Sequence, residues 1–350
     1  MGEKTKEFER RFEDFLGGDI FATALSSATA SLHIALLSLG IGEGDEVIIP
    51  ALTFVADINV VRVVGATPKL ADCGSFSNWN VTAKSIKEQI TDRTKAVIVV
   101  HFGGYPCEMD EIVKLCRERE IYLIEDVAHA VGAKYKGKSC GTFGDFGCFS
   151  FFTNKNLSVG EGGMLVTSNE EFYNLSKYYR SHGMSALTLD RHKGRAISYD
   201  VVLSGLNYRI DEMRSSLGIV QLSKLKEANR RREILVERYI KNLEKVEKIT
   251  IPFLDLKDDY ISSYHIFTIL LSSSVDRDRV ILELKRRGIQ SSIHYPAFRE
   301  FTAFKGLNLN RAPIAEYISK HELTLPLYPT LKLEEVDFVC ENLKDILGEV

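Results

Sequence analysis

The sequence has no run of residues that could form a membrane-spanning helix. Hydrophobic residues make up 45% of its 350 residues, yet no apolar stretch approaches the ~18 consecutive residues that a span requires. The first residues, MGEKTKEFERRFEDF, are charged and amphipathic, so they do not form a secretory signal. We therefore expect neither a membrane protein nor a secreted one, and we predict a cytoplasmic location.

An excess of charge of one sign is also missing. The 45 Lys and Arg residues and the 48 Asp and Glu residues give a formal net charge of −3. Binding to nucleic acid by counterion release needs a basic face, which a near-neutral chain does not supply. We therefore expect no nucleic-acid partner.

Cysteines are few, and their spacing carries no motif. None of the six belongs to a CxxC pair, and they are scattered along the chain: Cys73, Cys107, Cys116, Cys140, Cys148 and Cys340. Zinc sites and disulfide scaffolds have closer and more regular spacings. We expect buried, reduced thiols and no metal site.

What the sequence does contain is an alternation of apolar strands and amphipathic helices. The patterns predict strands at 20–24, 46–49, 96–100 and 121–124 and helices at 4–16, 32–40, 82–90 and 110–119. This alternation is typical of an α/β fold with a mostly parallel sheet covered on both faces. In such sheets ligands bind beyond the carboxyl ends of the strands, where we expect Asp126 to project.

The C-terminal third predicts a second, smaller domain. A long helical pattern covers 210–246, and short strands at 265–271 and 291–294 then alternate with helices at 278–287 and 333–347. A chain of this length is long enough for two domains. We predict a large domain over residues 1–235 and a smaller α+β domain over residues 236–350.

Three features could together hold pyridoxal phosphate. Thr29 and Ala30 follow a hydroxyl-rich helix start that suits a phosphate, Asp126 follows a strand, and Lys155 lies in the glycine-rich segment GDFGCFSFFTNKNLSVGEGGMLVT. The cofactor needs a phosphate cup, a partner for its ring nitrogen and an amine for its aldehyde. Each feature alone has an ordinary alternative, namely helix capping for the hydroxyls and Asp126 and a solvated surface position for Lys155.

Longer motifs resemble the DegT/DnrJ/EryC1/StrS family, the sugar aminotransferases among the fold-type I pyridoxal-phosphate enzymes. The resemblance covers nearly the whole chain and implies the aspartate aminotransferase-like large domain, with a seven-stranded, mostly parallel sheet, and a smaller C-terminal domain. The segments that carry it, in the family's order, are SSATASLHIALLSLGIGEGDEVIIPALTFVA, EDVAHAVGA, FSFFTNKNLSVGEGG, GLNYRIDEMRSSLGIVQL, GIQSSIHYP and TLPLYP.

The resemblance implies the catalytic roles of two residues. Lys155 would form the Schiff base with pyridoxal 5′-phosphate and then move a proton between the substrate carbon and the cofactor. A neutral amine is needed for this, so we expect burial or a nearby cation to lower the pKa of Lys155. Asp126 would pair with the protonated ring nitrogen.

The resemblance also implies the residues that bind the cofactor. Phe54 would stack on the ring, and His129 would contact the side of the ring that carries the phenolic oxygen. Core packing and a hydrogen-bonded core position are the ordinary alternatives for these two side chains. The phosphate would be held by Thr29 and Ser150 and by the amides of Ala28 and Ala30.

Further implied residues concern partners and substrate. Asn207, in GLNYR, matches an asparagine that reaches the phosphate from the partner subunit, so the resemblance implies a homodimer. We expect His294 and Tyr295 on the substrate side. The basic loop 190–195 could meet a nucleotide diphosphate, but runs of charge are usually solvated, and we favour that interpretation.

Two departures from the family pattern bear on these expectations. The family usually has glycine where this chain has Ala28, and an alanine would be strained there if the position needed a positive φ. The chain also begins near the family's first helix. We therefore expect the usual leading segment, which contributes to the substrate entrance, to be missing.

The implied reaction is pyridoxal-phosphate-dependent transamination of a keto sugar, nucleotide-linked, with glutamate or glutamine as amino donor. Two alternatives stay open: a cyclitol (keto-inositol) aminotransferase, and a cofactor-binding sensor without catalytic activity. The family's sugar dehydratases have histidine at the lysine position, so Lys155 argues against that branch.

Overall fold

A seven-stranded sheet forms the centre of the protein. The computed structural model describes residues 1–185, 200–255 and 259–348, so the basic loop 190–195 lies outside the described residues. The strand order is β1-β9-β8-β5-β4-β2-β3. The bounds are β1 Phe21–Leu25, β2 Glu46–Pro50, β3 Thr67–Ala71, β4 Thr94–Val100, β5 Tyr122–Asp126, β8 Phe146–Ser150 and β9 Gly163–Thr167. The pairs β1–β9 and β8–β9 are antiparallel and the other four are parallel, which confirms the predicted sheet.

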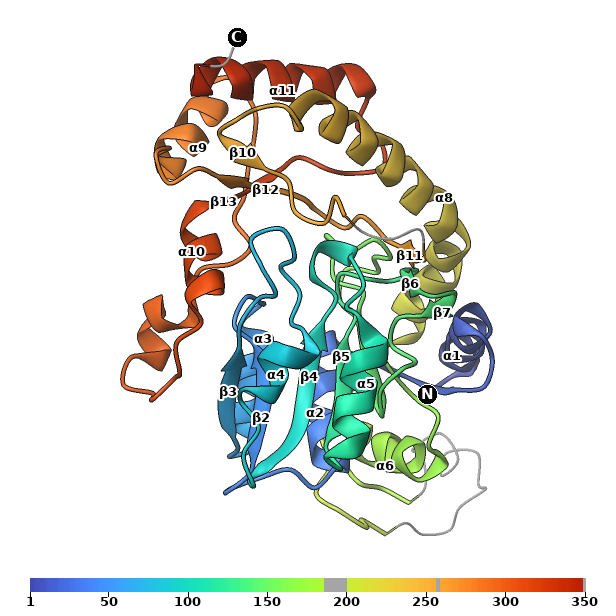
Figure 1. Ribbon diagram of the computed structural model, residues 1–350. Helices are drawn as coiled ribbons and strands as arrows, with labels where there is room; N and C mark the ends of the chain where they lie inside the picture. The colour runs from blue at the N-terminus through green and yellow to red at the C-terminus, as the bar shows by residue number, and fades with distance from the viewer. Residues whose placement is uncertain (186–199, 256–258, 349–350) are drawn as a thin grey trace.

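Helices cover both faces of this sheet (Figure 1). They are α1 Glu3–Leu16, α2 Ala28–Ser38, α3 Ala56–Val63, α4 Ala83–Lys87, α5 Met109–Glu118 and α6 Glu170–Arg180. Val97 and Leu123 pack with α4 and α5, whereas the next residues, Ile98 and Ile124, pack with α2 and α3. Successive side chains of a strand point to opposite faces, so the continuous apolar runs of the central strands bury both faces.

A long helix leads to a second, three-stranded sheet. The helix α8 Glu212–Leu243 runs along one side of the molecule up to α11, as Figure 1 shows. The sheet has the order β10-β12-β13 and packs with α8, α9 and α11. These elements are β10 Ile249–Thr250, β12 Phe267–Leu271, α9 Arg277–Arg286, β13 Glu322–Leu325 and α11 Leu333–Leu347. Short elements complete the described part: β6 Lys134–Tyr135, β7 Lys138–Ser139, β11 Tyr260–Ile261, α10 Pro313–His321 and the 3-10 helices η1 Phe102–Gly104, η2 Phe298–Glu300 and η3 Thr302–Phe304.

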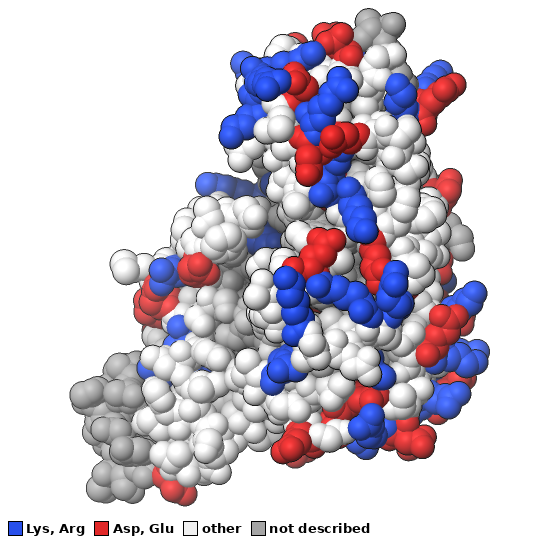
Figure 2. Space-filling model, turned by 90° about the vertical axis from the view of Figure 1, so that its left-hand side faces the viewer, with Lys and Arg blue, Asp and Glu red and all other residues white. Residues whose placement is uncertain are grey.

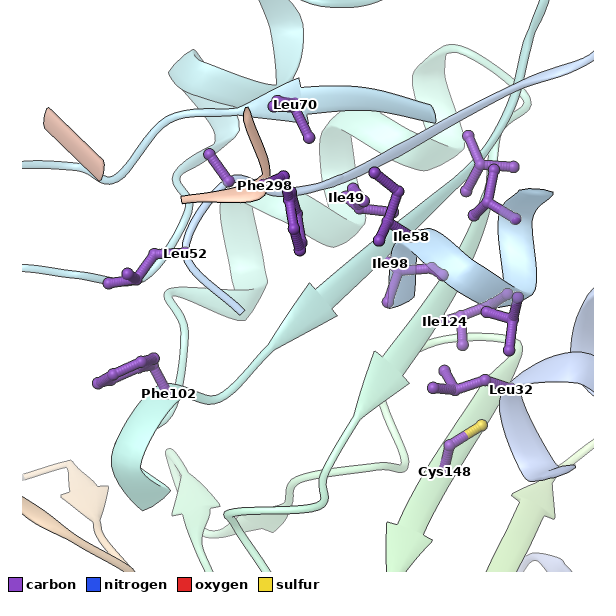
Figure 3. Close-up of a cluster of buried hydrophobic side chains, with 14 of the residues drawn as sticks. Leu32, Ile49, Leu52, Ile58, Leu70, Ile98, Phe102, Ile124, Cys148 and Phe298 are labelled. Atoms are coloured by element: carbon purple, nitrogen blue, oxygen red, sulfur yellow. The ribbon is translucent and has the colours of Figure 1, made fainter. Parts of the chain in front are cut away.

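The segment that contains η2, η3 and α10 packs on the central sheet although it lies late in the sequence. Phe298 belongs to the same buried cluster as Ile49 and Leu70 (Figure 3). Asn310 pairs with the edge strand β3: its Nδ2 donates to the carbonyl of Leu70 at 2.7 Å and its Oδ1 accepts from the N–H of Leu70 at 2.9 Å. This contact covers an edge that could otherwise pair with another chain.

The predicted elements agree with the structure within a few residues, with one correction. Residues 291–294 form no strand, and Ser292 makes a single bridge to Thr324 of β13. The reason is a tertiary contact, because the N–H of His294 donates to the Glu322 carboxylate rather than to a neighbouring strand. The domain boundary at residue 235 stays a prediction, and α8 crosses it without interruption.

The surface and the thiols fit an ordinary folded chain. On the face drawn in Figure 2, Lys and Arg are interspersed with Asp and Glu rather than gathered into a patch of one sign. All six cysteines are buried free thiols. None of the helices in the described part of the chain combines the length and apolar character needed to cross a bilayer.

Candidate active site

A cavity of about 360 Å³ lies at the carboxyl ends of the parallel strands. β5 ends at Asp126 and β8 ends at Ser150, and both side chains line the cavity. The structure brings nine of the eleven predicted site residues together in its wall; Ala30 and Asn207 are not among the lining residues. The nine are Ala28, Thr29, Phe54, Asp126, His129, Ser150, Lys155, His294 and Tyr295.

The N-terminus of α2 forms part of the wall. Ser27 is the N-cap, and its Oγ accepts a hydrogen bond from the N–H of Ala30 at 3.1 Å. This bond occupies the Ala30 amide, which was predicted to hold phosphate. The N–H groups of Ala28 and Thr29 belong to the first turn, where a helix has no intrahelical acceptor and carries a partial positive charge. These two amides can hold an anion.

Gly163 permits the start of β9 to lie close to the start of α2. The free amides of Ala28 and Thr29, with Gly163 beside them, form what we call the α2 cradle. A Cβ at this position would lie 2.3 Å from the carbonyl carbon of Ser27 and 2.7 Å from the nitrogen of Ala28. β9 can therefore begin against the helix start only with glycine there. Ser150, which pairs with Gly163 across the two strands, brings a hydroxyl to the same region.

Alanine is unstrained at position 28. Ala28 is the first residue of the right-handed helix α2, and it is not among the non-glycine residues with positive φ. The family's glycine is therefore not needed here for a left-handed conformation. This departure from the family pattern leaves the cradle geometry intact.

Asp126 is a buried carboxyl group at the end of β5. Its Oδ1 accepts the N–H of Ala128 at 2.8 Å. Burial raises the pKa of Asp126, while the Ala128 bond and the charge of Lys155 act in the opposite direction. A cation placed against this group would favour its ionised form further.

Lys155 lies in the turn between β8 and β9. Its backbone N–H donates to the carbonyl of Phe152 at 2.9 Å, and Phe152 forms a bridge with Gly160. Burial lowers the pKa of the Lys155 amine to about 8, although the charge of Asp126 raises it. A fraction of the amine is therefore neutral near pH 7, as a nucleophilic lysine requires.

The residue after Lys155 anchors the turn to distant parts of the chain. Asn156 Nδ2 donates to Asn229 Oδ1 of α8 at 2.9 Å and to the carbonyl of Ser263 at 2.7 Å. Its Oδ1 lies 2.9 Å from Nδ1 of the buried His265. Since an amide oxygen only accepts, His265 donates in this contact. The network fixes the backbone from which the Lys155 side chain enters the cavity.

Phe54 lies in the loop after β2, and its ring is not part of the core. The residue is 53% exposed and lines the cavity. Its ring centroid lies 5.8 Å from that of Tyr295, at an interplanar angle of 54°. The core-packing alternative therefore does not describe Phe54, whereas a free aromatic face in a cavity suits stacking on a planar ligand.

His129 and Tyr295 form a hydrogen bond whose direction follows from their neighbours. His129 Nδ1 accepts the N–H of Gly103 at 3.3 Å, and burial, with Lys155 and His294 nearby, lowers the pKa of His129 well below its usual value. The neutral ring must therefore carry its proton on Nε2, which lies 2.9 Å from the Tyr295 hydroxyl. Tyr295 accepts there and can donate its own proton to a ligand.

His294 reaches the cavity from the loop after α9, next to the Ser292 bridge to β13. Its Nδ1 lies 2.8 Å from Thr324 Oγ1, and its backbone N–H donates to Glu322 Oε2 at 2.7 Å. Burial, assisted by Lys155, lowers the pKa of His294 to about 4, so the imidazole is neutral near pH 7. The cavity is thus bounded by residues at the edge of the central sheet and by this loop, which is hydrogen-bonded to β13.

Asn207 lies apart from the cavity. It is exposed, and its backbone forms a bridge with Ser181. The described residues of the single chain do not place its side chain in the cavity wall.

Several residues of the site were not predicted from the sequence. Asn154 and Glu161 line the cavity, Asn156 and His265 hold the lysine turn, and the buried Asp57 interacts with Asp126. For Asp57 a signal existed, because it is the lone charged residue in the mostly apolar run TFVADINVV. The others have no comparable signal, since their roles depend on contacts between segments far apart in the sequence.

The lowered pKa of Lys155 predicts a pH dependence. Pyridoxal phosphate added to the cofactor-free protein should be captured covalently at a rate that rises about tenfold per pH unit below pH 8 and levels off above it. The reason is that only the neutral amine attacks an aldehyde. Borohydride trapping at a series of pH values measures this rate, with Lys155→Ala as the blank. A midpoint near the ordinary lysine value of 10.5 would contradict the prediction.

The lining residues fit pyridoxal phosphate. The helix start beside Gly163 is a cradle that a Cβ would fill, and its free amides suit a phosphate. Asp126 supplies a buried carboxyl group, Phe54 an exposed ring and Lys155 an amine of lowered pKa in the same cavity. These match what that cofactor needs, namely an anion site, a partner for the ring nitrogen, a stacking surface and an amine that can react with an aldehyde.

Comparisons with known proteins point in the same direction. The family model described as the DegT/DnrJ/EryC1/StrS aminotransferase family matches residues 1–344. The chain is 37% identical to uncharacterized protein MJ1066 of Methanocaldococcus jannaschii, over 100% of this chain and 91% of that protein. It is 33% identical to the GDP-perosamine synthase of Escherichia coli O157:H7, over 99% of this chain and 91% of that enzyme.

Solved structures share the fold. Spr1654 from Streptococcus pneumoniae in its PMP form superposes with a TM-score of 0.92 at 30% sequence identity, covering 100% of this chain and 93% of that one. The same protein has also been solved in a PLP form, with a TM-score of 0.91. A protein of this fold therefore binds the cofactor for which the cavity residues are suited.

Proposed function

Because the chain belongs to the DegT/DnrJ/EryC1/StrS aminotransferase family, whose members act on sugars, we propose that it transfers an amino group from glutamate or glutamine to a nucleotide-linked keto sugar. The observation that carries this proposal is the meeting of Lys155, Asp126 and the α2 cradle in one cavity. The nucleotide link is supported by the similarity to a GDP-perosamine synthase, which covers 99% of the chain.

We infer that pyridoxal phosphate binds with its phosphate at the α2 cradle. The amides of Ala28 and Thr29 and the hydroxyls of Thr29 and Ser150 would hold the phosphate. Phe54 would cover one face of the ring and Asp126 would pair with the ring nitrogen. When bound, the cofactor supplies an aldehyde for covalent attachment of amines and a ring that accepts the electrons of a deprotonated carbon.

In this proposal Lys155 has two tasks. Its Nζ would hold the cofactor covalently between turnovers and would become a free amine when an amino substrate takes its place. The free Nζ would then remove the proton from Cα of the donor amino acid; the donor's nitrogen would stay with the cofactor, and water would supply the oxygen of the 2-oxo acid that leaves. In the second half-reaction Nζ would deliver a proton to the former carbonyl carbon of the sugar, which would take up that nitrogen and leave as an amine. A pKa of about 8 suits both directions of transfer.

Tyr295, His129 and His294 would act on the substrate side of the cavity. The hydrogen bond from His129 orients the Tyr295 hydroxyl, so that its proton is available to an oxygen of the cofactor or the sugar. The neutral His294 can accept a hydrogen bond without adding charge. These contacts position the substrate.

The proposal is tested by separating the two half-reactions. Glutamate or glutamine should convert the holoenzyme to its pyridoxamine form, seen by mass spectrometry of the released cofactor. That form should then be converted back by nucleotide-linked keto sugars, with an amino sugar as product. Turnover by keto-inositol alone would favour the cyclitol alternative. Failure of every amino donor to convert the bound cofactor would favour a sensor.

We also infer a homodimer, which would bring Asn207 to the cavity of the partner. An apolar stripe at i, i+4 and i+7 on α8, formed by Met213, Leu217 and Val220, is exposed, with Met213 at 81%. This apolar stripe begins a few residues after Asn207 in the sequence. Contiguous exposed apolar side chains at helical spacing mark interfaces.

Charges in this stripe should separate the subunits. The double substitution Met213→Asp and Leu217→Asp is expected to weaken self-association at least about 10²-fold, because it buries unpaired carboxylates in the interface. Light scattering after size-exclusion chromatography measures the mass. Leu282→Asp on α9, at another exposed leucine, is the matched control and should leave the mass unchanged. Equal masses for all proteins would contradict the inferred interface.

A further inference from the structure

Asp57 is a buried acid that the proposed mechanism does not use. It lies in α3, is 0% exposed and is not among the residues that line the cavity. Its Oδ2 accepts a hydrogen bond from Thr53 Oγ1 at 2.6 Å. We propose that Asp57 is a positioning residue, which keeps a proton at neutral pH and donates it in a hydrogen bond to Asp126, so that Asp126 stays ionised and fixed in orientation.

The other oxygen of Asp57, Oδ1, indicates where the proton lies. If Asp57 is written as a carboxylate, Oδ1 is buried without any hydrogen-bond partner among the described residues. A buried oxygen of this kind is costly unless a donor reaches it or it becomes a donor itself. The side chains of Asp57 and Asp126 are within hydrogen-bond reach of each other. Two carboxylates cannot bond to each other, so one of the pair must hold a proton.

The surroundings place that proton on Asp57. Among residues 1–185, 200–255 and 259–348, the groups that interact electrostatically with Asp57 are Asp126, Cys148 and Tyr295, and none of these three supplies a positive charge. Asp126, in contrast, accepts an N–H bond from Ala128 and faces the positive charge of Lys155. Burial and the Asp126 charge raise the pKa of Asp57 well above its usual value, while the Asp57 bond lowers that of Asp126.

The arrangement fixes Asp126 without neutralising it. The Ala128 N–H holds one side of the carboxylate and the Asp57 hydroxyl would hold it from behind, so that its remaining lone pairs are left for the cavity. A second ionised carboxylate would instead repel Asp126 and raise its pKa. Only the consequence for the ring nitrogen rests on the proposed function; the position of the proton does not.

Asparagine reproduces the proposed state of Asp57. Its amide oxygen can accept from Thr53, and its NH₂ group can donate to Asp126. Asp57→Asn is therefore expected to bind pyridoxal phosphate within about threefold of the wild-type Kd. Asp57→Ala, which removes the donor, should raise the Kd about tenfold or more. If Asp57 were ionised, Asp57→Asn would lose a charge, and its Kd would rise as much as that of Asp57→Ala.

The decisive measurement uses the cofactor-free protein. An unfolded Asp has a pKa of about 3.9, so a higher pKa in the folded state makes folding take up a proton and lowers stability as pH rises above that value. Asp57→Asn has no such group. The ratio of the unfolding equilibrium constant of wild type to that of Asp57→Asn should therefore increase about tenfold per pH unit, from about pH 5 up to the pKa of Asp57 in the folded protein. Urea unfolding at about pH 5, 6 and 7 measures this.

Controls separate this inference from the proposed function. Asp92→Asn, at an exposed aspartate, should show a difference from wild type that does not change with pH. A constant difference for Asp57→Asn as well would overturn the proton assignment. A widening difference in a chain that fails to bind pyridoxal phosphate would instead support the proton on Asp57 and overturn the proposed cofactor site.

Discussion

Lys155→Ala is expected to lower kcat for transamination at least about 10³-fold. In the proposed reaction Lys155 is both the amine that binds the cofactor covalently and the group that moves the proton, and loss of a positioned acid–base group alone costs about 10²- to 10⁴-fold. The variant should still bind pyridoxal phosphate through the α2 cradle, since Ala28, Thr29 and Ser150 are untouched. Borohydride should no longer fix the cofactor to the protein, which peptide mass spectrometry shows directly.

Two further variants make this result specific. Lys155→Arg keeps a positive charge but has no amine that can be neutral near pH 7, so it should be as inactive as the alanine variant. Lys224→Ala, at an exposed lysine of α8, should retain wild-type activity and covalent capture. Covalent capture of the cofactor by Lys155→Ala would show that another lysine is the attachment site and would refute the proposed role.

Asp126→Asn is expected to lower kcat about 10²- to 10³-fold while leaving the fold intact. The amide oxygen can still accept the N–H of Ala128, so the end of β5 keeps its local structure. What is lost is the negative charge that, in the proposed function, faces the ring nitrogen, and removal of one such electrostatic group in a buried site has effects of this size. Single-turnover conversion of the cofactor by the amino donor isolates the step.

The same variant should change the titration of Lys155 in a direction that can be checked. The charge of Asp126 raises the pKa of Lys155, which is about 8 in the wild type. Without that charge, the midpoint for covalent capture should move below pH 8. An Asp126→Asn enzyme with an unchanged midpoint and full activity would place Asp126 outside the reacting centre. Asp92→Asn is the matched control for loss of an exposed carboxylate.

Periodicity predicted the elements of the fold well where each element buries its own apolar pattern. The helices at 4–16 and 333–347 and the strand at 96–100 are found within two residues of the predicted ends. The strand at 291–294 was wrong because a side chain from β13, Glu322, takes the backbone N–H of His294. The packing of Phe298 and Asn310 on the central sheet was also beyond sequence analysis, because those contacts join segments far apart in the chain.

In the candidate site, too, features that depend on local sequence could be predicted, whereas contacts between distant segments could not. Asp126 could be placed from its position after a parallel strand, and the α2 start from its hydroxyl residues, because both depend on local sequence. The bond between His129 and Tyr295, the contact of Asn156 with His265 and the pairing of Asp57 with Asp126 could not be predicted. Each joins two segments whose distance is fixed only by the folded chain.

Residue order alone specified the mostly parallel sheet and the helix start that can hold an anion, because both follow from side-chain periodicity and from residue types within a short span. The choice of Lys155 as the amine and Asp126 as the acid came from the resemblance to the family and stays a prediction. The tertiary structure alone decided how strongly each group is removed from water and which charges face it. Burial lowers the pKa of Lys155 and raises that of Asp57, and burial is a property of neighbours that the linear order of residues does not specify.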